Sequence, residues 1–152
     1  MTSRLQLALN VDNLEAAINY YSRLFDTQPH KVRNAYANFA IDNPPLKLVL
    51  FENPQAPERL HHLGVEVFEI GQVAAASKRL SDGHILEQVQ LNETCCHATQ
   101  DKVWSRDPQG MRWEWYRIID DAPEPHLNQT QAEQTRTDKT CCIEKATGTG
   151  YV

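Results

Sequence analysis

The stretch Leu5-Gln6-Leu7-Ala8-Leu9-Asn10-Val11 decides the fold, because its pattern returns 56 residues later in His62-Leu63-Gly64-Val65-Glu66-Val67. In both stretches large apolar residues alternate with small or polar ones, which is typical of a β-strand with one buried face. An amphipathic helix is predicted after each stretch. Starts of strand–helix units resemble one another, so chance is one explanation of the match. As a true repeat, it predicts two paired βαβββ modules and an α+β fold.

Periodicity and turn-forming residues predict the other elements. Asp12, with Glu15 three residues later, is the predicted N-cap of the first helix. The second helix is predicted over Ile70–Leu80 and ends near Gly83. The turn Asp107-Pro108-Gln109-Gly110 should close a hairpin between the last two strands. The predicted strands are Leu5–Val11, Tyr36–Ile41, Leu46–Glu52, His62–Val67, Ile85–Leu91, Thr94–Ala98, Lys102–Arg106 and Arg112–Ile119.

The chain has 152 residues, a length that suits one domain. Residues 1–120 are the predicted folded unit, with modules at about 3–53 and 60–119. Residues 121–152 are rich in Thr, Gln, Asp and Glu and hold four large apolar side chains, too few to offset the entropy of ordering the segment. The four large apolar residues are Leu127, Ile143, Tyr151 and Val152. We therefore expect a flexible polar tail.

Charge and hydropathy exclude two classes of partner. The net charge is −5, from 15 basic and 20 acidic side chains, and no basic run is present, so we expect no nucleic-acid partner. No apolar stretch approaches the roughly 18 residues of a membrane helix, and the N-terminus lacks the apolar core of a signal peptide. The expected location is therefore the cytoplasm, where thiols stay reduced.

Three polar residues on predicted strands form a candidate metal site. The repeat places Gln6 and His62 at equivalent positions, on the face opposite the Leu/Val row, whereas His61 should point with that apolar row. Alternation puts Glu114 on one face of the last strand and its two flanking tryptophans on the other. Imidazole, carboxylate and amide together suit a borderline or hard divalent cation with open positions for water or substrate. The alternative is a surface glutamine, a hydrogen-bonded histidine and a solvated glutamate.

The four cysteines form two adjacent pairs, Cys95–Cys96 and Cys141–Cys142. Adjacent cysteines make poor structural crosslinks, because the loop that they would close is trivial. Cys95 and Cys96, with His97 beside them, could bind a soft, thiophilic centre as thiolates. Alternatively, one is a buried small hydrophobe and the other is incidental. Core packing cannot explain the pair in the polar tail, which favours capture of a soft ion, although a regulatory or incidental pair remains an alternative.

These modules and this set of ligands resemble the vicinal oxygen chelate superfamily, which includes glyoxalase I, fosfomycin and bleomycin resistance proteins and extradiol dioxygenases. Within it, five segments resemble the carbon–arsenic lyases and the related cadmium-induced proteins. The segments are residues 5–9, LQLAL; 36–41, YANFAI; 44–50, PPLKLVL; 62–67, HLGVEV; and 94–96 with 100–104, TCC and QDKVW. The resemblance covers nearly all of residues 3–117. The cysteine segment is its most specific part, because glyoxalases and extradiol enzymes lack it.

The resemblance implies a vicinal oxygen chelate fold with a metal-binding cleft and assigns a role to each candidate residue. Gln6, His62 and Glu114 match the family's Fe(II) ligands, and Cys95 and Cys96 match the thiols that hold a trivalent organoarsenical. The implied activity is that of a nonheme Fe(II) dioxygenase with O₂ as co-substrate. It cleaves the carbon–arsenic bond of methylated or aromatic trivalent arsenicals and releases inorganic As(III), which confers organoarsenical resistance.

Two residues depart from the family pattern without removing a ligand. His97 stands where a tyrosine is expected, and Trp115 is bulkier than the expected aliphatic residue but should face away from the metal. The tail pair Cys141–Cys142 resembles the cysteine-bearing ends of these proteins.

Two other functions remain as alternatives. One is a metal-dependent isomerase or thiol transferase of the glyoxalase or fosfomycin type, which gives no purpose to Cys95–Cys96. The other is a non-enzymatic resistance protein that sequesters Cd(II) or As(III), which leaves the three metal ligands unexplained. A single chain supplies all the proposed ligands, so either a monomer or a homodimer would suffice.

Overall fold

The computed structural model describes residues 1–95 and 97–121, and within them it contains ten helices and strands. In chain order they are β1 (Ser3–Val11), α1 (Leu14–Leu24), β2 (Lys31–Arg33), β3 (Tyr36–Ile41), β4 (Leu46–Glu52), β5 (Leu60–Val67), α2 (Gln72–Asp82), β6 (Leu86–Thr94), β7 (Thr99–Arg106) and β8 (Arg112–Asp120). The strands form one mixed sheet in the order β2-β3-β4-β1-β5-β8-β7-β6. The chain therefore consists of two βαβββ modules, as predicted, and the fold is of the α+β class.

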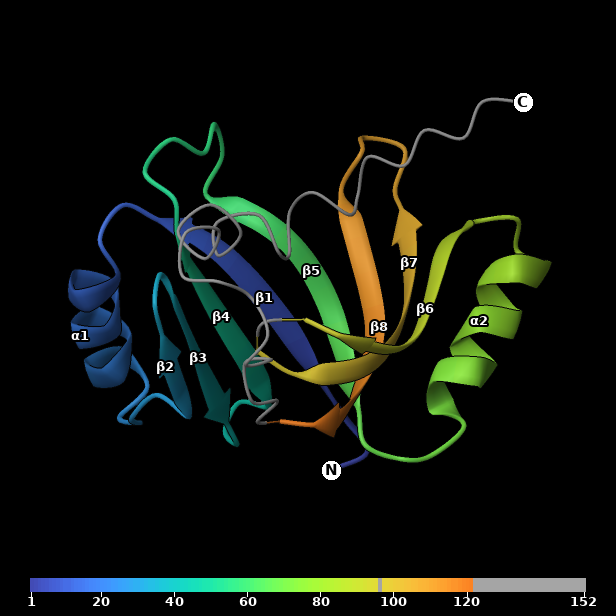
Figure 1. Cartoon of the computed structure of the whole chain (residues 1–152), viewed down its shortest axis with the longest axis horizontal. Coiled ribbons are helices and arrows are strands. Elements are labelled where there is room, and N and C mark those ends of the chain that lie inside the picture. Colours follow the sequence, from blue (N-terminus) through green and yellow to red (C-terminus); the bar gives the residue numbers. More distant parts are fainter. Residues whose placement is uncertain (96, 122–152) are drawn as a thin grey trace, which may run out of the picture.

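The two modules join through β1 and β5, which pair antiparallel at the centre of the sheet (Figure 1). Leu7 lies opposite Leu63, so a pseudo-twofold axis through this pair relates each residue of β1 to the residue 56 positions later in β5. Gln6 and His62 are therefore pseudo-symmetric, as the repeat predicts. Alternation within each strand decides which face of the sheet a side chain takes. The pairing of β1 with β5 then places the side chains of Gln6 and His62 diagonally opposite each other on one face.

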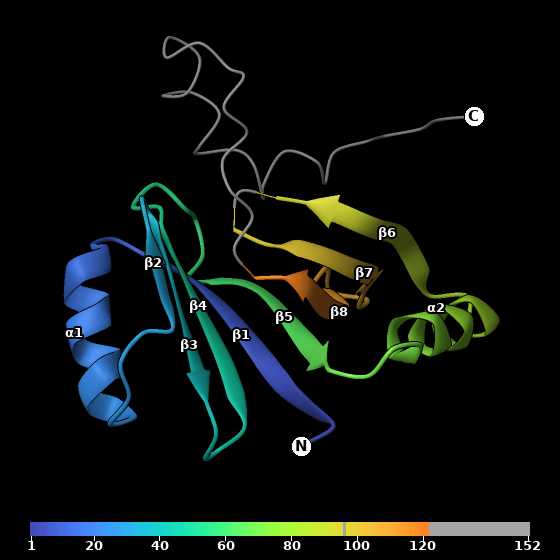
Figure 2. The same ribbon diagram turned by 60° about the horizontal axis from the view of Figure 1, so that its bottom comes forward.

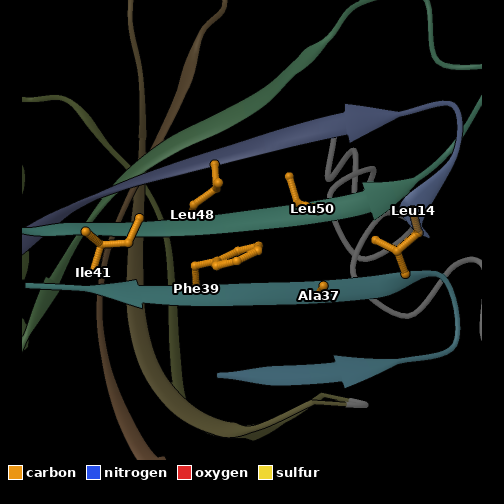
Figure 3. Packing of buried hydrophobic residues seen from close by; sticks show 6 residues of the cluster. All are labelled: Leu14, Ala37, Phe39, Ile41, Leu48 and Leu50. Carbon is orange, nitrogen blue, oxygen red and sulfur yellow. The ribbon is translucent and has the colours of Figure 1, made fainter. Parts of the chain in front are cut away.

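The helices cover the outer faces of the two halves of the sheet, at opposite ends of the molecule (Figures 1 and 2). Under α1, six buried residues from α1, β3 and β4 form one core (Figure 3). They are Leu14, Ala37, Phe39, Ile41, Leu48 and Leu50. A second core lies under α2 and contains Val65, Val67, Val73, Ala76 and Val103. Because these apolar rows face the helices, the alternate residues of the same strands face the inner side of the sheet, where a cavity lies between the modules.

The helix starts differ from the predictions. Asn13, not Asp12, is the N-cap of α1, and its Oδ1 accepts a hydrogen bond from the backbone N–H of Ala16 at 2.8 Å. Asp12 instead pairs with Arg59 at 2.7 Å, because β1 runs on through Val11 and the helix begins only at Leu14. The second helix begins two residues later than predicted, because Gly71 precedes it with a left-handed φ of 91°.

One predicted strand, at the first cysteine pair, is wrong, and one strand was missed. Thr94–Ala98 is not a strand: β6 ends at Thr94, and β7 begins at Thr99. Since β6 and β7 pair antiparallel, the chain must reverse between them, and the N–H of Cys95 donates to the carbonyl of Ala98 at 3.0 Å within this turn. The short strand β2 was not predicted, because three residues with one apolar side chain show no alternation.

The proposed tail and the pair Cys141–Cys142 lie outside the described residues, apart from Asp121. Within the described residues, neither helix has the length and apolar character needed to cross a bilayer.

Candidate functional site

Gln6, His62 and Glu114 converge on the inner face of the sheet from β1, β5 and β8. The Nε2 atom of His62 lies 3.0 Å from the side-chain amide nitrogen of Gln6 and 3.1 Å from Oε1 of Glu114. The amide of Gln6 also donates a hydrogen bond to Oε1 of Glu114. All three side chains are buried. The structure therefore brings together three residues that lie as far as 108 positions apart in the sequence.

Gly64 makes this convergence geometrically feasible. It pairs with Gln6 on one side and with Glu114 on the other. A Cβ atom at this position would lie 2.8 Å from Cγ of Glu114 and 3.3 Å from the amide nitrogen of Gln6. A glycine inside a strand often marks such a close approach, and that was the signal in the sequence for this residue.

The three donor groups fit a metal ion. Two ligands at right angles and about 2.1 Å from an ion lie about 3 Å from each other, which matches the two separations from His62. A half-turn of the Gln6 amide group exchanges its oxygen and nitrogen and directs the amide oxygen toward the centre. Across residues 1–95 and 97–121 there is no group of three His, Cys, Asp or Glu side chains arranged for a metal, so an amide has to complete this set.

The charge of Glu114 also suits a cation. Burial by itself would raise the pKa of this carboxyl group, but the charge of Lys102 and then the charge and hydrogen bond of His62 lower the pKa to about 2. Nζ of Lys102 lies 3.5 Å from Oε2. That oxygen is buried and accepts no hydrogen bond in the described part of the chain. Glu114 is therefore an ionised carboxylate at neutral pH with an oxygen available to a ligand.

The pseudo-symmetric counterpart of Glu114 is Val49. Val49 pairs with Ala8 in the first module as Glu114 pairs with Gly64 in the second. Val49 is buried and lines the cavity, so the fourth symmetric position offers no donor. A metal held by three residues would keep its remaining coordination positions on this apolar side of the cavity.

His61 does not face the apolar row, contrary to the prediction. The register between β1 and β5 shifts between Ala8 and Leu9, where Ala8 pairs with His62 and Leu9 with Leu60, so His61 is the extra residue of a β-bulge. Bulges re-aim side chains, and the His61 ring lies 4.9 Å from the ring of Phe51, which lines the cavity. No feature of the sequence pattern signals this bulge.

His61 contacts His62 directly, with 2.6 Å between their Nδ1 atoms. Burial and then the charge of His62 lower the pKa of His61 to about 4, although Glu114 opposes the shift. His61 is therefore neutral at physiological pH and can accept a hydrogen bond from the Nδ1–H of His62. When a metal ion takes the place of the Nε2 proton that His62 shares with Glu114, this Nδ1–H tautomer would direct the Nε2 lone pair toward the ion.

Cys95 lies on the wall of the same cavity and is half-buried. Its predicted partner Cys96 lies outside the described residues. The turn that carries Cys95 docks on the first module: the His97 ring stacks on Tyr36 with 3.8 Å between centroids, and Lys31 donates to the His97 carbonyl at 2.7 Å. Lys31 also binds Asp121 at 3.0 Å. These contacts, unseen in the sequence, hold the thiol-bearing turn over the cavity.

The tryptophans divide between the two faces of the sheet. Trp104 forms part of the cavity wall, 5.3 Å from the His62 ring between centroids, and donates from Nε1 to Gln90 at 2.8 Å. Trp115 packs in the core under α2, where Arg79 lies 4.6 Å from its ring, so it faces away from Glu114 as expected.

The sequence and the fold are similar to those of known proteins. Residues 4–115 match the model of the Glyoxalase/Bleomycin resistance protein/Dioxygenase superfamily. The cadmium-induced protein CadI of Mycobacterium tuberculosis is 54% identical over 120 residues, which cover 79% of each chain. A trivalent organoarsenical cleaving enzyme of Thermomonospora curvata is 46% identical over 147 residues, covering 96% of this chain and 92% of that one. The crystal structure of methylmalonyl-CoA epimerase from Mycobacterium tuberculosis superposes with a TM-score of 0.53 at 15% identity, over 83% of this chain and 90% of that one.

Proposed function

This chain belongs to the Glyoxalase/Bleomycin resistance protein/Dioxygenase superfamily, and from this premise we propose that it cleaves the carbon–arsenic bond of trivalent organoarsenicals. The substrates are methylarsonous acid and trivalent aromatic arsenicals, and the product is inorganic As(III). The observation that carries this proposal is that three buried metal-binding groups and the Cys95 thiol line one cavity. The similarity to an organoarsenical cleaving enzyme over nearly the whole chain supports it.

Gln6, His62 and Glu114 would hold Fe(II), which when bound supplies the activation of O₂. Each residue has a distinct task. Glu114 brings a negative charge that persists to low pH. His62 brings a nitrogen lone pair whose direction is set by the contact with His61. Gln6 adds a neutral oxygen, so the residues neutralise only one of the two positive charges of the ion.

Cys95 and Cys96 would capture the substrate through arsenic. Each thiol replaces one hydroxyl group of the trivalent arsenical: an As–S bond forms, an As–O bond breaks, and the thiol proton leaves with the hydroxyl group as water. No change of oxidation state is needed. Attachment to the wall of the cavity turns an encounter between substrate and metal site into an intramolecular step. Such positioning can supply a large part of the rate acceleration of an enzyme. The docked turn and Trp104 would exclude bulk water.

Arsenic speciation tests the proposal. Full-length reduced protein is loaded with Fe(II) without oxygen, mixed with methylarsonous acid and exposed to air, while arsenite release and O₂ uptake are followed. We expect both to depend on the protein, on Fe(II) and on the arsenical. Cys95→Ser should abolish turnover at low substrate concentration, and Cys141→Ser serves as the matched thiol control. If wild-type protein with bound Fe(II) yields no arsenite, the lyase function is wrong.

A second function is favoured by one observation, the similarity to a cadmium-induced protein. In that case the thiols would sequester Cd(II) or As(III) without chemistry on the ligand. The same experiment distinguishes the two functions, because sequestration predicts tight binding of Cd(II) without arsenical-dependent O₂ uptake. In either function a single chain contains every proposed ligand.

A further inference from the structure

Arg112 is a cation on the cavity wall that the proposed metal and thiol chemistry does not use. It is the first residue of β8, and its guanidinium carbon lies 3.9 Å from the centre of the Trp104 ring. Its side chain is 18% exposed and lines the cavity. Its Nε atom is buried and makes no hydrogen bond within the described part of the chain. Stacking on the indole therefore holds the guanidinium in place while leaving its hydrogen-bonding capacity largely unused.

The charge of Arg112 is only partly compensated. Its nearest carboxylate is Glu87, at 3.6 Å from Nε. Glu87 is bound more closely by Arg106, through hydrogen bonds of 2.8 and 3.3 Å to one carboxylate oxygen. Two guanidinium groups thus share one carboxylate, which leaves an excess of one positive charge. Arg106 is 43% exposed and does not line the cavity, so the poorly compensated cation beside the cavity is Arg112.

The strand registers place Arg112 and the Cys95 turn on opposite sides of Glu114 along β8. Thr94 pairs with Thr99, and Thr99 with Asp120, so the turn that carries Cys95 belongs to the C-terminal end of β8. Glu114 lies six residues nearer the start of the strand, and Arg112 lies two residues beyond it on the same face, roughly 7 Å further along. The order along the cavity is therefore thiol, metal ligands, cation.

Cys95, Glu114 and Arg112 line one cavity, and their order suggests how an aromatic arsenical would be oriented in it. With arsenic bound at Cys95 and the carbon–arsenic bond directed toward Glu114, the organic substituent would extend toward Arg112. The Trp104 ring lies between the metal ligands and the cation: its centroid is 5.3 Å from that of His62 and 3.9 Å from the guanidinium carbon of Arg112.

We propose that Arg112, stacked on Trp104, is the binding site for an anionic group on the organic substituent of the substrate. This inference rests on the proposed function and identifies, among its aromatic substrates, those with an acidic group on the ring, such as a carboxylate, as the ones that bind most tightly. The planar guanidinium can bind a carboxylate through two parallel hydrogen bonds. Partial burial of the side chain keeps this contact less screened by water than it would be on the surface.

A pair of nearly isosteric probes tests the site. Binding of 4-carboxyphenylarsonous acid and of 4-carbamoylphenylarsonous acid to the full-length reduced protein is measured without oxygen, by competition with a soluble dithiol. Because both probes carry the same arsenic group, thiol capture cancels in the ratio of their affinities. We expect the carboxylate to bind about tenfold more tightly to wild-type protein. The preference should shrink as salt is added.

Two variants assign the preference to a residue. Arg112→Met should reduce the ratio to about one, whereas Arg117→Met, which removes a guanidinium that pairs with Asp101 and does not line the cavity, should retain the preference. Equal binding of the two probes to wild-type protein would overturn the anionic subsite but leave the lyase proposal standing. A preference for the carboxylate that survives Arg112→Met would have the same two consequences. Failure of both probes to bind would overturn thiol capture and this inference with it. The wild-type ratio and its salt dependence need no variant, so they decide the question even if Arg112→Met does not fold.

Discussion

Nδ1 of His61 lies 2.6 Å from Nδ1 of His62, although the two residues are neighbours on one strand and should face opposite sides of the sheet. The bulge at His61 is what permits this contact. Since a metal-binding histidine uses one ring nitrogen as a ligand, the other carries the proton and needs an acceptor. His61 provides that acceptor inside the cavity wall.

Replacing His61 should therefore weaken metal binding. We expect His61→Phe to lower the affinity for Fe(II) or Co(II) about tenfold to a hundredfold, because His62 loses the partner that sets its tautomer and ring orientation. A titration of the metal-free protein with Co(II), followed by absorption, measures the effect. His84→Asn, at a histidine that does not line the cavity, is the control. An affinity for Co(II) equal to that of wild type would show that His61 does not position His62.

Gly64→Ala should destabilise the protein and disrupt the metal site together. The new Cβ would lie 2.8 Å from Cγ of Glu114, so Glu114 or the strand must move. We expect a loss of about 1–3 kcal/mol in the free energy of unfolding, as for other overpacked positions. Urea unfolding and Co(II) titration provide the two measurements. In Gly83→Ala the nearest atom would be 3.3 Å away, so the loss should be smaller; an equal loss in both variants would contradict the argument.

The stability of the metal-free protein should fall in acid because of Glu114. The folded state lowers the pKa of this group from 4.5 to about 2, so its stabilising contribution is present above pH 4.5 and is lost as the pH falls toward 2. The full contribution is on the order of 3 kcal/mol. Urea unfolding at pH 7 and at pH 3.5, with a chelator present, should show a smaller loss for Glu114→Gln than for wild type. The exposed Glu15→Gln variant should behave as wild type, and parallel curves for all three proteins would refute the assignment.

Lys31 should control access to the Cys95 thiol. Lys31→Met removes the bonds from Nζ to the His97 carbonyl and to Asp121, which hold the turn on the first module. In a background in which Cys95 is the only cysteine, we expect the thiol to react about tenfold faster with a disulfide reagent, because loss of a charged hydrogen bond shifts the turn toward open states. Lys78→Met, which breaks an exposed ion pair within α2, is the control. An unchanged rate would mean that other contacts hold the turn.

The sequence by itself determined the features that arise from local periodicity. Alternation in residues 5–11 and 62–67 predicted the two central strands and the inner faces of Gln6 and His62, and the 56-residue repeat predicted their pseudo-symmetric pairing. The face of Glu114 also followed from alternation within its own strand. These predictions hold because a strand of either module has the same period of two wherever it lies in the sheet.

Only the tertiary structure decided the features that depend on register between strands. The bulge at His61 arises from the pairing of β5 with β1, and the apolar counterpart of Glu114, Val49, is defined by the pairing of β4 with β1. The docking of the Cys95 turn depends on Lys31 of the other module, and the place of Arg112 depends on how β8 lies beside β7. A strand's own pattern specifies which face a side chain takes, but cross-strand pairing specifies its neighbours, and those neighbours come from distant parts of the chain.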